Sequence, residues 1–112
     1  MRKIKIAVDA RTLGSRPSGV GMYLNDFLEQ LINYDEFEWV LFTDVAKSEY
    51  IKRFEARGIR VISWGKPVYK SAGVYLYFNF IRNELKNVSP DIFWEVNTIC
   101  LLYTSDAADD LI

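Results

Sequence analysis

Apolar and polar positions along this chain follow a pattern that changes regularly between strand and helix. Short, nearly continuous apolar runs predict buried strands, and longer segments with apolar residues three and four positions apart predict helices. The predicted strands cover residues 3–9, 37–43, 59–64 and 91–95 or 96, and the predicted helices cover residues 19–33, 46–57 and 71–88. This alternation predicts an α/β fold, a Rossmann-like parallel sheet of about four strands with helices on both faces.

The apolar stripes of the first and third helices predict which faces are buried. In the first helix the stripe consists of Val20, Tyr23, Leu24, Phe27, Leu28 and Leu31. In the third it consists of Val74, Tyr77, Phe78, Ile81, Leu85 and Val88, while Tyr75, Leu76 and Phe80 lie off the stripe. A helix that is apolar nearly all round is buried against something additional. A wide core face is the favoured interpretation, and a partner domain or a lipid-linked acceptor are the alternatives.

Composition and charge exclude several classes of function. The 112 residues are half hydrophobic, as expected for one folded domain, and the net charge of −1 leaves no basic face for nucleic acid. The absence of histidine excludes Ser-His-Asp and Cys-His catalysis and histidine-ligated zinc within this sequence. A single cysteine excludes an internal disulfide, and no signal-peptide pattern follows Met1, so we expect a cytoplasmic protein.

In open sheets of this type ligands bind beyond the carboxyl ends of the strands. The candidate segments are therefore 11–21, Asp44, 65–70 and 95–98. Gly19 and Gly21 open the first helix, where free N–H groups favour a phosphate, although the same glycines suit an ordinary turn. Leu24 replaces the third glycine of a dinucleotide fingerprint, and no acidic residue ends the second strand in the ribose-binding position.

Charged residues in and beside these segments either bind a ligand or have an ordinary structural or solvent-exposed role. Asp9, at the end of the first strand, either binds a metal or caps the following turn, and the cap is the favoured role. Arg11, Arg16, Lys66 and Lys70 flank the predicted cleft, where they either neutralise an anionic ligand or are solvated loop charges.

Two segments resemble the family-four retaining glycosyltransferases, many of them mannosyltransferase-like. They are Ile6-Ala7-Val8-Asp9-Ala10-Arg11 with the following Arg16-Pro17-Ser18-Gly19-Val20-Gly21-Met22-Tyr23, and Pro90-Asp91-Ile92-Phe93-Trp94-Glu95-Val96-Asn97. The resemblance covers residues 3–99 and is specific to the family, not to a substrate. Many members carry arginine at the position of Met22 and a histidine near Trp94, Glu95 and Asn97, so those contacts are absent or replaced here.

The resemblance implies the acceptor-side N-terminal domain of a two-domain enzyme of the GT-B type. Such an enzyme moves a sugar, with retention, from a nucleotide-sugar donor to a hydroxyl of a glycan or lipid-linked acceptor. The implied substrate-binding residues are Gly19 and Gly21, with Arg16, Glu95 and Asn97 as further cleft residues. No metal, cofactor or nucleic acid is expected. Peripheral membrane association is compatible with a lipid-linked acceptor. The resemblance does not identify catalytic residues in this chain. The donor-binding C-terminal domain, with its paired glutamates, is not in this sequence, so we expect the chain alone to be inactive.

The end of the sequence has a different character. Residues 100–110 read Cys, Leu, Leu, Tyr, Thr, Ser, Asp, Ala, Ala, Asp, Asp, and resemble the conceptual translation of a transposase-type sequencing adapter. We therefore expect an incomplete domain over residues 1–99 and a non-native tail over residues 100–112, whose Cys100 and aspartates carry no function. A short fifth strand or a terminal helix is the alternative.

Other function classes remain open from the residues alone. One is a nucleotide- or dinucleotide-binding module of the oxidoreductase type, which the missing third glycine disfavours. Another is a receiver-like interaction domain, which needs an acidic cluster around Asp9 and an aspartate after the third strand, where Gly65-Lys66 stands.

Overall fold

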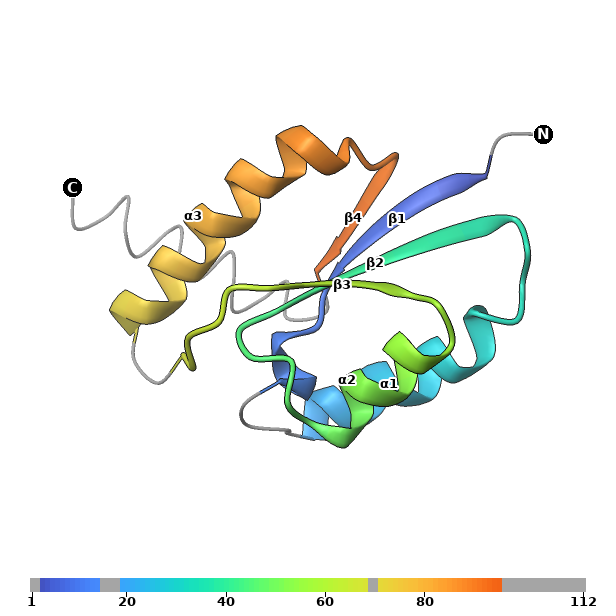
Figure 1. Cartoon of the computed structure of the whole chain (residues 1–112), viewed down its shortest axis with the longest axis horizontal. Coiled ribbons are helices and arrows are strands. Elements are labelled where there is room, and N and C mark those ends of the chain that lie inside the picture. The colour runs from blue at the N-terminus through green and yellow to red at the C-terminus, as the bar shows by residue number, and fades with distance from the viewer. Residues whose placement is uncertain (1–2, 15–18, 69–70, 96–112) are drawn as a thin grey trace.

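The computed structural model describes residues 3–14, 19–68 and 71–95 (Figure 1). In chain order the elements are β1 (Ile4–Asp9), a short 3-10 helix η1 (Arg11–Leu13), α1 (Gly19–Leu31), β2 (Phe37–Thr43), α2 (Glu49–Ala56), β3 (Arg60–Ser63), α3 (Ser71–Val88) and β4 (Ile92–Glu95). Each predicted strand and helix is present. No described helix is long and apolar enough to cross a membrane.

The strands form one parallel sheet in the order β3-β2-β1-β4. β1 therefore lies in the centre, between the strand that follows it in sequence and the last strand of the described chain (Figure 1). The fold is α/β and Rossmann-like, as predicted. Its order, 3-2-1-4, is the first part of the 3-2-1-4-5-6 arrangement, and it differs from the 2-1-3-4-5 order of receiver-like and flavodoxin-like sheets.

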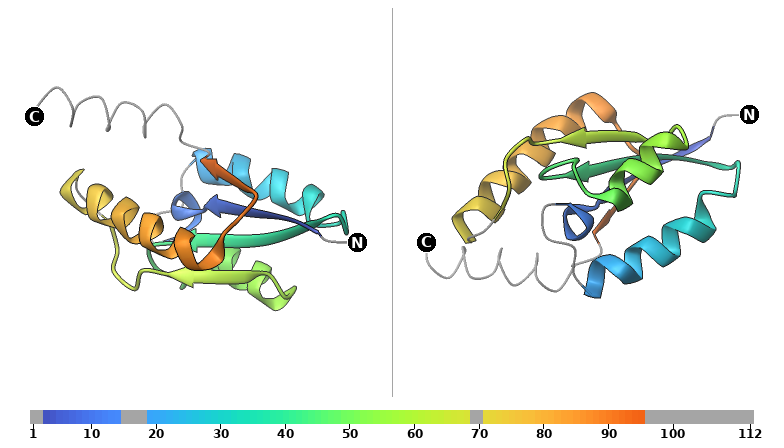
Figure 2. Two further views of the ribbon diagram at one scale, coloured as in Figure 1. Left: turned by 90° about the horizontal axis from the view of Figure 1, so that it is seen from above. Right: turned by 60° about the horizontal axis from the view of Figure 1, so that its bottom comes forward.

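Helices cover both faces of the sheet, as the pattern predicts. α1 and α2 lie on one face and α3 lies on the other (Figures 1 and 2). The buried core under α1 and α2 consists of Ile6, Val8, Ala10, Leu13, Leu24, Leu28, Trp39, Leu41, Ile51 and Phe54. The core under α3 consists of Ala7, Val40, Phe42, Val68, Tyr77, Ile81 and Val88. Consecutive residues of β1 and β2 thus alternate between the two cores, because side chains of a strand point to opposite faces in turn.

Helix boundaries follow capping chemistry more closely than the apolar pattern does. α2 begins at Glu49, not at residue 46, because the Ser48 side chain caps it and accepts a hydrogen bond from the Ile51 N–H at 3.2 Å. At the other end Gly58 has a φ of +87°, which confirms the predicted left-handed position after the helix. α1 ends at Leu31, two residues before the predicted boundary at residue 33.

The helix faces correct three sequence expectations. Tyr23 and Phe27 of the predicted α1 stripe are 62% and 40% exposed, although Phe27 packs edge-to-face on Trp94 of the edge strand β4. Phe80 of α3 was expected off the core, yet its ring packs on Phe42 at 6.4 Å. Tyr75 and Leu76 are 57% and 54% exposed, so the wide core face favoured for this helix does not extend to them.

Candidate functional site

The order of the strands places a topological switch point between β1 and β4. The chain leaves β2 for β3 on one side of β1 and returns to β4 on the other, so the direction of winding reverses between β1 and β4. Ligands of open α/β sheets bind at such a switch point, beyond the carboxyl ends of the strands. Asp9 ends β1, Glu95 ends β4, and the two are register partners. Two carboxylates, 3% and 8% exposed, therefore lie side by side at the switch point.

The Asp9 carboxylate organises the carboxyl end of β1. Its Oδ1 accepts a hydrogen bond from the Arg11 backbone N–H at 3.1 Å, which confirms the predicted cap of the following turn. The same oxygen accepts a second hydrogen bond, from the Tyr77 hydroxyl at 2.7 Å. Asp9 therefore joins β1, η1 and α3 at one point.

Tyr77 is fully buried, and its hydroxyl is held in the protonated form. Burial is the largest cause that raises the pKa of the Tyr77 phenol well above its usual value, followed by the negative charge of Asp9 and the hydrogen bond to it. The nearby Arg11 lowers the pKa, but by less. At neutral pH the Tyr77 hydroxyl is thus a fixed donor to Asp9. Tyr77 belongs to the predicted core stripe of α3, but the pattern does not predict its contact with Asp9, although a buried tyrosine hydroxyl needs a polar partner.

Aromatic and cationic side chains continue from Tyr77 along the same edge. The Arg11 guanidinium carbon lies 5.9 Å from the centre of the Tyr77 ring. The Trp64 ring packs edge-to-face on the Tyr77 ring, with the ring centres 6.1 Å apart, and the Lys66 Nζ lies 5.7 Å from the centre of the Trp64 ring. Rings of this kind stack on sugars and bases, and the cations attract anions.

The glycines that open α1 differ in their surroundings. Gly19 is exposed, and a Cβ added there meets nothing within 4 Å. Gly21 is buried, and a Cβ there lies 2.1 Å from the Thr12 carbonyl oxygen. Gly21 therefore lets α1 pack directly on the backbone of η1. This is a packing role, and the expected contact of Gly21 with substrate stays a prediction.

Asp44 is part of the scaffold beside the switch point. It is 1% exposed, its Oδ1 accepts from the Val45 N–H at 2.8 Å, and its Oδ2 accepts from the Val68 N–H at 3.0 Å. It thereby fixes the segment that leads from β3 towards α3. Gly14 allows this arrangement, because a Cβ there lies 2.1 Å from the Asp44 Oδ1.

The structure thus gathers Gly19, Gly21 and Glu95 at the carboxyl edge of the sheet, together with Asp9 and Arg11. Arg16, Asn97, Lys70 and the 100–112 tail lie outside the described residues. No group of three or more acidic, cysteine or histidine side chains suited to a metal ion occurs in the described part of the chain.

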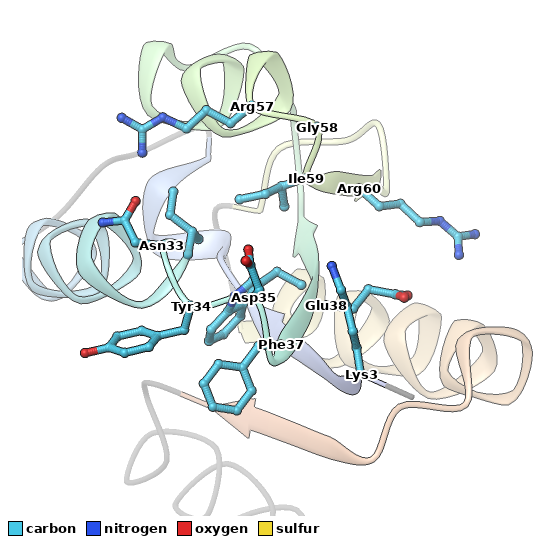
Figure 3. Close-up of a pocket in the computed structure, with 12 residues that line it drawn as sticks. Lys3, Asn33, Tyr34, Asp35, Phe37, Glu38, Arg57, Gly58, Ile59 and Arg60 are labelled. Carbon is cyan, nitrogen blue, oxygen red and sulfur yellow. The ribbon is translucent and has the colours of Figure 1, made fainter. Parts of the chain in front are cut away.

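A hollow of about 480 Å³ lies at the opposite, amino edge of the sheet (Figure 3). Figure 3 shows that the Arg57 and Arg60 side chains point outward in opposite directions, so their charges do not converge on the hollow. Arg57 is instead paired with Glu29 at 2.7 Å. The charged side chains of this hollow therefore do not form a converging binding site.

No protein-family model matches this sequence, and neither a curated protein nor a solved structure is detectably similar to it.

Proposed function

We propose that this chain supplies the acceptor-side domain of a retaining, nucleotide-sugar-dependent glycosyltransferase. The observation that supports this most is the pairing of β1 with β4. The two segments that resemble the family-four enzymes are far apart in sequence, yet Asp9 of the first and Glu95 of the second are neighbours in the sheet. The resemblance and the switch point of the fold therefore coincide.

The chemistry of this edge suits such an enzyme. Glu95 offers a carboxylate to acceptor hydroxyls, and the exposed start of α1 at Gly19 offers backbone N–H groups towards a phosphate. In the intact enzyme the donor lies between this domain and a second one. Positioning of the acceptor and stabilisation of the leaving phosphate then supply most of the rate.

A dinucleotide-dependent oxidoreductase is less well supported. The acidic residue nearest to the ribose-binding position is Asp44, and both of its carboxylate oxygens accept backbone hydrogen bonds. Asp44 is also only 1% exposed, so ribose binding by its carboxylate requires the surrounding loops to move. The sheet order likewise disfavours the receiver-like alternative.

Extension of the reading frame tests the proposal directly. We expect the source DNA, sequenced without library adapters past the codon of Ile99, to continue into a second α/β domain with paired glutamates. The encoded protein should transfer a labelled sugar from a nucleotide-sugar panel, with the anomeric configuration retained in the product. Calorimetric titration of the 112-residue chain with NADH is the counter-test. Micromolar binding of NADH would contradict the proposal and favour an oxidoreductase.

A further inference from the structure

Arg11 is a half-buried cation whose charge is not neutralised within the described part of the chain. Its Nε atom is buried and has no hydrogen-bond partner there, and no ion pair joins its guanidinium to a described acidic side chain. Arginine presents five donors in a planar fork, and a buried donor without an acceptor is costly. A buried arginine Nε–H without a hydrogen-bond partner therefore indicates that an acceptor from outside the described residues binds there.

Asp9, two residues before Arg11 in the sequence, does not fulfil this role. Asp9 uses its Oδ1 for the Arg11 backbone N–H and the Tyr77 hydroxyl. The interaction found for the guanidinium is instead with the face of the Tyr77 ring. Stacking on an aromatic ring holds the plane of a guanidinium in place and leaves its edge, with the N–H groups, for an oxyanion.

We propose that the Arg11 guanidinium binds an oxyanion, a phosphate or a carboxylate, carried by the acceptor sugar. The acceptor is then an anionic carbohydrate, not a neutral one. The oxyanion part of this inference stands on Arg11 alone, whereas the carbohydrate part rests on the proposed function. Trp64, which packs edge-to-face on Tyr77, offers a ring for the sugar, and Lys66 adds positive charge beside Trp64.

The test is a titration of the 112-residue chain followed by NMR signals of arginine Nε–Hε groups. The probes are inorganic phosphate, mannose 6-phosphate, glucuronate and the neutral methyl mannoside. We expect the Arg11 signal, assigned by its loss in Arg11→Gln, to shift with the three anionic probes. We expect Arg11→Gln to weaken mannose 6-phosphate binding at least about tenfold, and Arg11→Lys to weaken it less, because lysine keeps the charge but not the fork.

Arg53 provides a matched control. Its guanidinium carbon lies 5.2 Å from the centre of the Tyr50 ring, so it is also an arginine stacked on a tyrosine, but on α2 and away from the switch point. Arg53→Gln should leave the affinity for every probe unchanged. Equal melting temperatures of the two glutamine variants exclude a general loss of fold.

The outcomes separate the two proposals. If methyl mannoside binds as tightly as mannose 6-phosphate and Arg11→Gln has no effect, the anionic acceptor is wrong while a glycosyltransferase is still supported. If phosphate binds through Arg11 and the sugar adds nothing to the affinity, the oxyanion site is confirmed and the carbohydrate function is contradicted. If no anion shifts the Arg11 signal at millimolar concentration, the oxyanion site is overturned. A preference between mannose 6-phosphate and glucuronate identifies the anion as a phosphate or a carboxylate.

Discussion

The Tyr77 hydroxyl donates a hydrogen bond of 2.7 Å to the Asp9 carboxylate, across 68 residues of sequence. This contact fastens the helix on one face of the sheet to the carboxyl end of the central strand, where the candidate site lies. Hydrogen bonds to charged groups contribute more than neutral ones, typically about 1.5–3 kcal/mol.

Tyr77→Phe should therefore lower the free energy of unfolding by about 1.5–3 kcal/mol, because the ring stays packed while Asp9 loses a donor. Urea unfolding followed by tryptophan fluorescence measures the change. Tyr75→Phe is the control, since Tyr75 is 57% exposed on the same helix and should unfold like the wild type. Equal destabilisation by both substitutions would show that the Asp9 contact contributes nothing specific.

The same contact predicts a dependence of stability on alkaline pH. The pKa of Tyr77 is raised in the folded protein, so its contribution is complete below the ordinary tyrosine pKa of about 10. As the pH rises above that value, the unfolded chain loses the phenol proton while the folded chain keeps it, and the folded state loses stability. We expect the stability difference between wild type and Tyr77→Phe to be constant up to about pH 10 and to shrink as the pH rises further. A difference that stays constant above about pH 10 would contradict a raised pKa.

We expect alanine to have opposite effects on protein stability at Gly21 and at Gly19. A Cβ at Gly21 collides with the Thr12 carbonyl oxygen, which is backbone and cannot move without displacing η1 from α1. Gly21→Ala should destabilise the protein by about 1–3 kcal/mol. Gly19→Ala meets nothing within 4 Å and should be neutral or stabilising by about 0.4–1 kcal/mol, because alanine restricts the unfolded chain. Thermal unfolding of the Gly21→Ala and Gly19→Ala variants measures the difference, and similar melting temperatures of the two variants would refute the packing role of Gly21.

Asp44→Ala should be strongly destabilising. It removes the acceptor from the Val68 N–H and the Val45 N–H, and an unsatisfied buried donor costs about 1–3 kcal/mol. Protease cleavage within the segment that follows β3 should accelerate, because that segment loses its attachment to the end of β2. Asp26→Ala, on the exposed side of α1, serves as the control and should leave both measurements unchanged.

Local patterns predicted the fold well, because each strand of a parallel sheet is buried on both faces and is therefore an apolar run that can be recognised by itself. The apolar run of β2 and the glycine after α2 both gave correct boundaries. Tyr23 and Phe27 were misplaced because periodicity identifies an apolar stripe but not how far the sheet extends beneath it. The site was predicted in part. The cap by Asp9 is local and was foreseen, whereas the Tyr77 contact depends on where α3 crosses the sheet, which no spacing in the sequence reveals.

The central position of β1 has a consequence for the order in which the protein is built. β1 is synthesised first, but one of its two neighbours is the last described strand, and the Lys5 N–H bonds the Asp91 side chain across 86 residues. During translation one side of β1 is therefore without its partner until β4 has left the ribosome. Contacts of such long sequence separation slow folding and prolong the exposure of strand edges. Within the described fold, the β1–β4 pairing is thus the last to form, and nascent chains should depend most on chaperones before that point.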